Sequence, residues 1–204
     1  MTQYRLLLLP EVMQRLAALD RAASTQGPGG LRTREFQALK LGLRVLADGR
    51  EEEFAGKRLR YRRHDLSDCA EIKLAVVPET RHNIDLGPSH RLIYREFESE
   101  DGGPPYRQVV AFAHRGADRP FEEAAAHLGR EAGARLPTVR AATDSLTHLS
   151  SPVAPIRQPL PPDLRKALAA ASDIAAASGA TKSRPPAQQH RSAPGRSTSN
   201  TREL

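Results

Sequence analysis

The segment Lys57–His64, with the sequence KRLRYRRH, carries five cationic side chains in its first seven residues, one aromatic ring and no acidic residue. Lysine and arginine neutralise phosphate charge, and a tyrosine ring can stack on a base. The segment therefore predicts a nucleic-acid-binding site formed by Lys57, Arg58, Arg60, Tyr61, Arg62 and Arg63. A solvated surface loop is the alternative, and the acidic run Glu51–Glu53 just before it is placed to neutralise it within the fold.

His114 is the best candidate for moving protons. A histidine ordinarily titrates near pH ~6.5, so it both gives and takes protons at cellular pH. His114 and Arg115 are consecutive in a predicted strand and should point to opposite faces of the sheet. Both serve one site only if the strand ends there, which Gly116 permits. The alternative role for His114 is to cap the end of the strand.

Lys73 alternates with Ile72 and Leu74, so it should face away from the side of the strand that enters the core. The single cysteine, Cys69, excludes an internal disulfide and is expected to be a buried packing thiol rather than a nucleophile. His82 and His90 flank a long loop without the spacing of a zinc site, and the glycines near Gly29 lack the following lysine of a phosphate loop. We therefore expect no metal and no cofactor.

The elements that must position these residues follow from periodicity. Apolar residues predict a short strand over Tyr4–Leu9 and helices over 10–23 and 33–47, and the second helix ends at Asp48-Gly49. Strand-like alternation covers Ala70–Val77, His90–Phe97 and Tyr106–His114, and a closing helix begins after Asp118, a candidate cap. This order predicts an α+β fold, with a helical hairpin packed on a small antiparallel sheet. One core should contain Leu16, Leu19, Phe36, Leu39, Leu43, Ile72, Leu74, Leu92 and Val110.

The net charge of +7 is uneven along the chain. Residues 151–204 contain 8 basic and 3 acidic residues, whereas residues 1–150 contain 23 and 21. Residues 132–204 are rich in Pro, Ala and Ser and predict a basic extension, with a short helix near 162–177 and disorder beyond residue 179. We find no targeting segment and no apolar run near the ~20 residues of a membrane span, so a cytoplasmic protein without membrane contact is expected.

Six segments in order resemble the RelE/ParE superfamily of toxins from bacterial type II toxin–antitoxin systems. The matching segments are Tyr4–Pro10, Glu11–Asp48, Gly56–Leu59 (GKRL), Ala70–Val77, Arg91–Tyr94 (RLIY) and Val109–Arg115, followed by the closing segment Phe121–Arg130. The resemblance covers about residues 3–131, which makes 1–131 the expected toxin domain. The loops Pro78–Ser89 and Glu98–Pro105 are longer than is usual in the family, and the extension has no counterpart in it, so retained activity does not follow from the resemblance alone.

The resemblance implies a RelE-like, ribosome-dependent mRNA endoribonuclease (an mRNA interferase) that a cognate antitoxin neutralises. It places Arg91 and Arg115 where the family binds phosphate and makes His114 and Lys73 further catalytic candidates. Such a reaction needs an acceptor for a 2′-hydroxyl proton, cations for the phosphorane and a donor for the leaving oxygen. The alternatives are a ParE-like poison of DNA gyrase and a non-catalytic nucleic-acid-binding relative. An acidic antitoxin is then another ligand for Lys57–His64.

Overall fold

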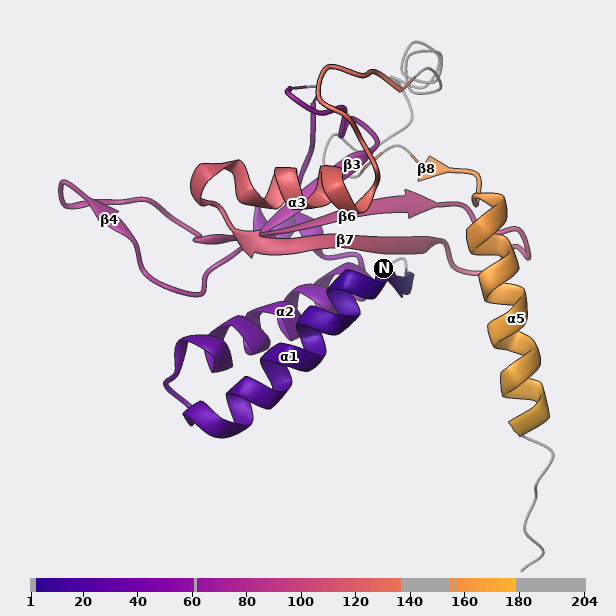
Figure 1. Cartoon of the computed structure of the whole chain (residues 1–204), viewed down its shortest axis with the longest axis horizontal. Coiled ribbons are helices and arrows are strands. Elements are labelled where there is room, and N and C mark those ends of the chain that lie inside the picture. Colours follow the sequence, from indigo (N-terminus) through magenta and orange to yellow (C-terminus); the bar gives the residue numbers. More distant parts are fainter. Residues whose placement is uncertain (1–2, 61, 137–154, 156, 179–204) are drawn as a thin grey trace, which may run out of the picture. The chain divides into compact units, whose positions relative to one another are not determined.

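The computed structural model describes residues 3–60, 62–136, 155 and 157–178 (Figure 1). The chain divides into two compact units, Met1–Pro161 and Pro162–Leu204. The described part of the second unit is helix α5 (Pro162–Ser178), at the place where the sequence predicts a helix. Pro162 and Asp163 suit its first turn, because proline needs no hydrogen-bond acceptor there and an acidic side chain favours the positive end of a helix. The tail expected to be disordered, 179–204, lies outside the described residues.

Within the described part of the first unit, six strands form one sheet, in the order β1-β7-β6-β3-β2 with β8 also paired to β6. Their bounds are Arg5–Leu8 (β1), Lys57–Arg58 (β2), Cys69–Leu74 (β3), His90–Phe97 (β6), Tyr106–His114 (β7) and Arg157–Gln158 (β8). The prediction of an antiparallel sheet is confirmed for β2–β3, β3–β6 and β6–β7. It is wrong for β1–β7 and β6–β8, which are parallel. Long stretches of chain separate these two pairs, and such connections can cross over to a parallel partner.

The helical hairpin α1 (Pro10–Gln26) and α2 (Leu31–Asp48) covers one face of the sheet (Figure 1). Gly49 ends α2 in the left-handed conformation, with φ 68°, and its N–H donates to the Val45 carbonyl. The hairpin and the sheet share a core that contains most of the predicted set. Leu19, Leu39, Ile72, Leu74 and Leu92 are buried there, and Leu16, Phe36 and Leu43 are partly buried against them.

Helix α3 (Arg119–His127) covers the opposite face and forms a second core with Leu59, Leu66, Cys69, Ile93, Val110 and Ala111 (Figure 1). Val110 was expected in the first core, and this expectation is wrong. The pairing of β6 with β7 shifts between Ile93 and Tyr94, which leaves Val110 as an extra residue in its strand. Such a bulge re-aims side chains, so Val109 and Phe112 both reach the first core although they are three residues apart.

The long loop Pro78–Ser89 folds into a small hairpin of β4 (Thr80–Arg81) and β5 (Ile84–Asp85) that extends away from the sheet (Figure 1). Its turn residues, His82 and Asn83, have φ values of 51° and 62°. Two positive φ values in a two-residue connection match the twist of a tight hairpin. This loop therefore has its own structure, and its stem returns to the main sheet.

Arg107 on β7 is fully buried among the carboxylates of Glu51 and Glu96. Its guanidinium donates to Glu51 at 2.6 and 2.9 Å, to Glu96 at 3.2 Å and to the Leu46 carbonyl at 3.0 Å. The Tyr4 ring lies 3.5 Å from the guanidinium carbon. Burial opposes the charge, but the hydrogen bonds to Glu51 and the nearby negative groups outweigh it and raise the pKa of Arg107. This cation thus joins β7 to β6, to the end of α2 and to the 3₁₀ helix η1 (Glu51–Phe54).

Replacing Arg107 with Met is expected to lower the free energy of unfolding by about 3–5 kcal/mol, because it leaves the buried carboxylate of Glu51 without its cation and removes one of the two cations that Glu96 contacts. Glu51→Gln should also destabilise. The double variant should lose clearly less than the sum of the single losses, since both changes remove one interaction. Urea unfolding of the four proteins measures this coupling, and strictly additive losses would contradict the proposed pairing.

Candidate active site and adjoining basic cavity

The strand register brings three of the predicted catalytic residues to one end of the central strands. Arg91 on β6 lies opposite Lys73 on β3 and opposite Ala113 on β7. His114, the last residue of β7, lies opposite His90. The sequence alone left this register open, and the structure fixes it so that residues from three strands share one region.

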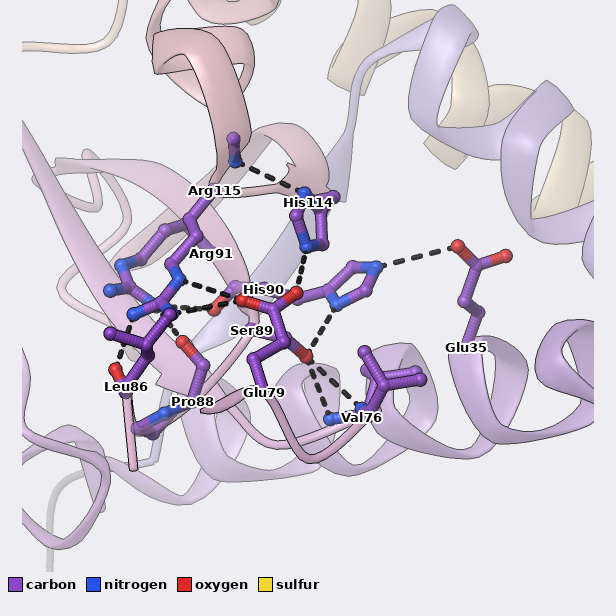
Figure 2. A network of polar contacts seen from close by, with 12 residues as sticks. Glu35, Val76, Glu79, Leu86, Pro88, Ser89, His90, Arg91, His114 and Arg115 are labelled. Carbon is purple, nitrogen blue, oxygen red and sulfur yellow. Dashed lines mark hydrogen bonds and ion pairs between the residues drawn. The ribbon is translucent and has the colours of Figure 1, made fainter. Parts of the chain in front are cut away.

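His114 and Arg115 contact the same carboxylate, that of Glu79 at the stem of the β4–β5 hairpin (Figure 2). Arg115 donates to Glu79 at 2.9 and 3.2 Å and also to the Leu86 carbonyl on the other side of the hairpin. The condition set from the sequence is met, because β7 ends at His114 and Arg115 takes a helical conformation with φ −65°. The end of the strand therefore lets two consecutive side chains reach one group.

The hydrogen bonds of His114 assign its proton. The Gly116 N–H donates to Nδ1 at 3.1 Å, so Nδ1 is the acceptor and Nε2 carries the hydrogen that is donated to Glu79. A Cβ at position 116 would lie 3.0 Å from Nδ1, which explains why glycine suits this close approach. The His114 hydrogen bond and then the Arg115 contacts lower the pKa of Glu79 from its usual value. The site therefore holds an ionised carboxylate beside an N–H donor.

Arg91 is half-buried next to this group. Its guanidinium donates to the carbonyls of Pro88 and His90 at 2.7 and 2.9 Å, and its Nε lies 3.6 Å from the buried carboxylate of Glu71. Burial lowers the pKa of Arg91, with Glu71 opposing that effect. Lys73 lies across the strand pair from Arg91, and no hydrogen bond or ion pair joins its ammonium to the described residues.

Behind His114 lies a buried polar chain that sequence reasoning missed. His90 Nδ1 lies 3.0 Å from Ser89 Oγ, and its Nε2 lies 3.3 Å from a carboxylate oxygen of Glu35 on α2 (Figure 2). Ser89 Oγ accepts from the N–H groups of Val76 and Val77, which ties the start of β6 to the end of β3. The His90 ring meets the His114 ring edge-on, with centroids 5.3 Å apart. This chain supports the strand end that carries His114.

The sequence pattern could have predicted part of this network, namely the pairing of Glu35 with His90. Glu35 lies four residues before Leu39 and eleven before Leu46, on the stripe of α2 that faces the core. A carboxylate on a buried stripe needs a partner, and His90 shares the inward face of β6 with Leu92. Glu79 carried no such signal, because it lies in a loop without periodicity.

The basic segment Lys57–His64 lines a cavity of about 780 Å³ together with the start of α3. The described residues of the predicted binding set all border it: Lys57, Arg58, Arg60, Arg62 and Arg63. Tyr61 lies outside the described residues. Leu59, Leu66 and Phe121 contribute apolar surface to the cavity, while Ala117, Asp118 and Glu122 close it on the side of α3. We call this space the basic cavity.

Two buried or half-buried carboxylates hold part of the cavity's charge. Glu122 contacts Arg63 at 3.2 Å and His64 at 3.0 Å, and Glu71 contacts Lys57 at 3.3 Å. The acidic run 51–53 was expected to neutralise the basic segment, but its ion pairs are with other residues: Glu51 binds Arg107 and Glu53 binds Arg50. The cavity is therefore neutralised by residues from β3 and α3 rather than by its sequence neighbours.

Cys69 is fully buried in the second core, which confirms the expected packing thiol. Burial raises the pKa of this thiol well above its usual value, so it stays protonated. Across the described ranges, no group of three or more His, Cys, Asp or Glu side chains is arranged to hold a metal ion. Among the helices that the structure describes, none is both long and apolar enough to cross a membrane.

Comparison of the chain with family models, with curated proteins and with solved structures found no match in any of the three. The resemblance to the RelE/ParE superfamily therefore depends on the sequence segments named above, and a functional assignment must be argued from the site.

The buried His90 generates a pH prediction. Burial lowers its pKa below the usual 6.5, with Glu35 opposing that shift, so the unfolded chain binds more protons than the folded chain in this range. The free energy of unfolding is expected to fall as the pH drops below about 6.5, and His90→Gln should reduce this slope. His82→Gln, in the exposed hairpin, is the control and should keep the slope. An unchanged slope in His90→Gln, measured by urea unfolding between pH ~5 and ~8, would contradict the assignment.

Proposed function

We propose that this chain is the toxin of a type II toxin–antitoxin system and acts as a ribosome-dependent mRNA endoribonuclease of the RelE type, neutralised by a cognate antitoxin. One observation carries the proposal: His114 and Arg115 both contact Glu79 at the end of β7, with Arg91 on the neighbouring strand. Carboxylate, guanidinium and imidazole groups can supply the base, the cations and the hydrogen-bond donor that cleavage next to a 2′-hydroxyl requires. The order of helices and strands supports the same proposal.

The proposed reaction forms a bond from the 2′-oxygen to phosphorus and breaks the bond from phosphorus to the 5′-oxygen. Glu79, kept ionised by its lowered pKa, accepts the proton of the 2′-hydroxyl. His114 donates a hydrogen bond from its Nε2–H to the leaving 5′-oxygen, which takes its proton from water. The products are a 2′,3′-cyclic phosphate and a 5′-hydroxyl. Glu79 then releases its proton to water, which restores the site with no net change in protons.

The guanidinium groups supply the charge that the phosphorane needs. Arg115 holds one carboxylate oxygen of Glu79 with two N–H groups, and its planar fork can hold phosphate oxygens in the same way. Arg91 is fixed by two backbone carbonyls, so its remaining donors are held in one orientation. Positive groups that are fixed before substrate binds stabilise developing charge without reorganising.

A non-catalytic nucleic-acid-binding role is the second candidate. The contacts of Glu79 with His114 and Arg115 favour it, because they occupy both groups. Glu79 already satisfies both His114 and Arg115, so a substrate phosphate must displace a carboxylate before either can act. In that role the basic cavity supplies the affinity, and the cluster at the end of β7 only anchors the β4–β5 hairpin. The gyrase poison remains an outcome to be tested.

Cleavage of a labelled mRNA on bacterial ribosomes tests the catalytic proposal. Glu79→Gln and His114→Gln should each slow cleavage about 100-fold or more, the usual effect of losing a general base or a fixed hydrogen-bond donor to developing charge. Arg115→Ala should cost about 100-fold through the lost contact to phosphate. Arg34→Ala, which removes an exposed cation from α2, is the control and should cleave normally. The new ends should carry 2′,3′-cyclic phosphate.

Induced expression provides the cellular test. Translation should stop before DNA replication, and Arg91→Ala and Arg115→Ala should relieve the arrest while staying folded. Replication that stops first, with gyrase-linked DNA breaks, would favour the gyrase poison. RNA binding without cleavage or growth arrest would leave the non-catalytic role.

A further inference from the structure

We propose that the basic cavity is a nucleotide subsite for single-stranded RNA, which holds the base next to the scissile phosphate against Phe121 and the adjoining phosphates on Arg60 and Arg62. This inference rests on the proposed function only for the position of the scissile bond. The binding of RNA is inferred from the shape and the charge of the cavity.

The cavity has the size and lining of a ligand site. Its volume of about 780 Å³ falls within the range of about 300–1,000 Å³ that small-molecule sites occupy. Phe121, Leu59 and Leu66 provide an apolar floor, and Phe121 is only partly buried. An aromatic ring at the bottom of a cationic cavity offers a stacking surface to any base.

The charge around the cavity favours phosphate. Five cationic side chains line it, against two carboxylates, Asp118 and Glu122. Glu122 is already engaged by Arg63 and His64. Arg60 and Arg62 are exposed, and the described part of the chain offers them no ion pair. The first turn of α3 also borders the cavity, and the side chain of Asp118 does not cap it, so its positive end adds to the attraction of an anion.

The cavity and the candidate active site adjoin each other. Ala117 borders the cavity and follows Arg115 by two residues, which span at most about 7 Å. A second link passes through Glu71, which is buried between Lys57 at 3.3 Å and Arg91 at 3.6 Å. Cations therefore follow one another from Arg115 and Arg91 to the border of the cavity, which places the cavity on the path of a strand bound at the candidate active site.

This continuity favours RNA over an acidic protein segment. A nucleic acid carries one charge and one flat base at every repeat, which matches a run of cations beside a single aromatic floor. An acidic peptide would satisfy the cations, but its carboxylates require neither the floor nor the alignment with Arg91 and Arg115. Arginine forks also match the oxygen pairs of phosphate closely.

Fluorescence anisotropy with the full chain and a labelled 2′-O-methyl hexauridylate, which cannot be cleaved, tests the subsite. Arg60→Ala/Arg62→Ala is expected to weaken binding about tenfold or more and to reduce the slope of log K against log salt by about 1.4. Phe121→Leu keeps an apolar side chain but loses the ring, and it should weaken binding about tenfold. Arg21→Ala/Arg34→Ala removes the same charge from exposed positions on the helical hairpin and should bind like the parent.

Each other outcome overturns a defined part of the inference. Equal affinities and salt slopes for the two double variants would show that the cavity does not hold RNA. A hexaglutamate peptide that displaces the labelled RNA as well as unlabelled hexauridylate does would assign the cavity to acidic protein segments instead. Parent binding that depends on Arg60 and Arg62, without cleavage on ribosomes, would keep the subsite and reject the proposed ribonuclease. If Arg60→Ala/Arg62→Ala binds the RNA like the parent and the parent cleaves mRNA on ribosomes, the ribonuclease proposal stands and the subsite is rejected.

Discussion

The charge of Arg107 is buried completely, and the surrounding elements are arranged so that this burial is compensated. A buried guanidinium without partners would destabilise the fold severely, so Glu51, Glu96 and the Leu46 carbonyl must all lie within reach of β7. These partners come from the last turn of α2, from η1 and from β6, while Tyr4 adds its ring from the residue before β1. Arg157 of β8 then pairs with the second oxygen of Glu96, at 2.7 Å. One cation thereby fixes the relative positions of elements that are far apart in the sequence.

The side chains of β7 alternate between two cores, and the bulge at Val110 shifts that alternation by one residue. The hairpin α1–α2 packs on one face and α3 on the other, so almost every residue of the central strands is buried. The ends of these strands are the places where polar side chains reach the surface. Arg91, His114 and Arg115 occur at such an end, and the β4–β5 hairpin brings Glu79 to them. A rigid double-faced sheet thus holds the site, and a loop completes it.

Carboxylates pair with the cations of both the candidate active site and the basic cavity. Glu71, Glu79 and Glu122 each hold cations in place without filling all of their donors. Side chains that are oriented in advance lose little conformational freedom when an anion binds. The same carboxylates also compete with that anion, so the affinity for phosphate depends on how readily each pair opens. Partially exposed pairs such as Arg63–Glu122 open at little cost, since exposed ion pairs are weak.

The sequence by itself determined the elements and the chemical types of the site. The strands His90–Phe97 and Tyr106–His114 and the apolar stripes of both helices were predictable, because local periodicity records which face of each element is buried. The strand end at Gly116 and the cationic run Lys57–Arg63 were visible in the same way. Only the tertiary structure decided the register that places Arg91 opposite Lys73 and the bulge that moves Val110 to the second core. It also decided that β1 pairs in parallel with β7, and β8 with β6. It also supplied Glu79 and Glu35 as partners of His114 and His90. Contacts between residues distant in the chain leave no local pattern, since they arise from the compensation of buried charge and from the packing of two cores on one sheet.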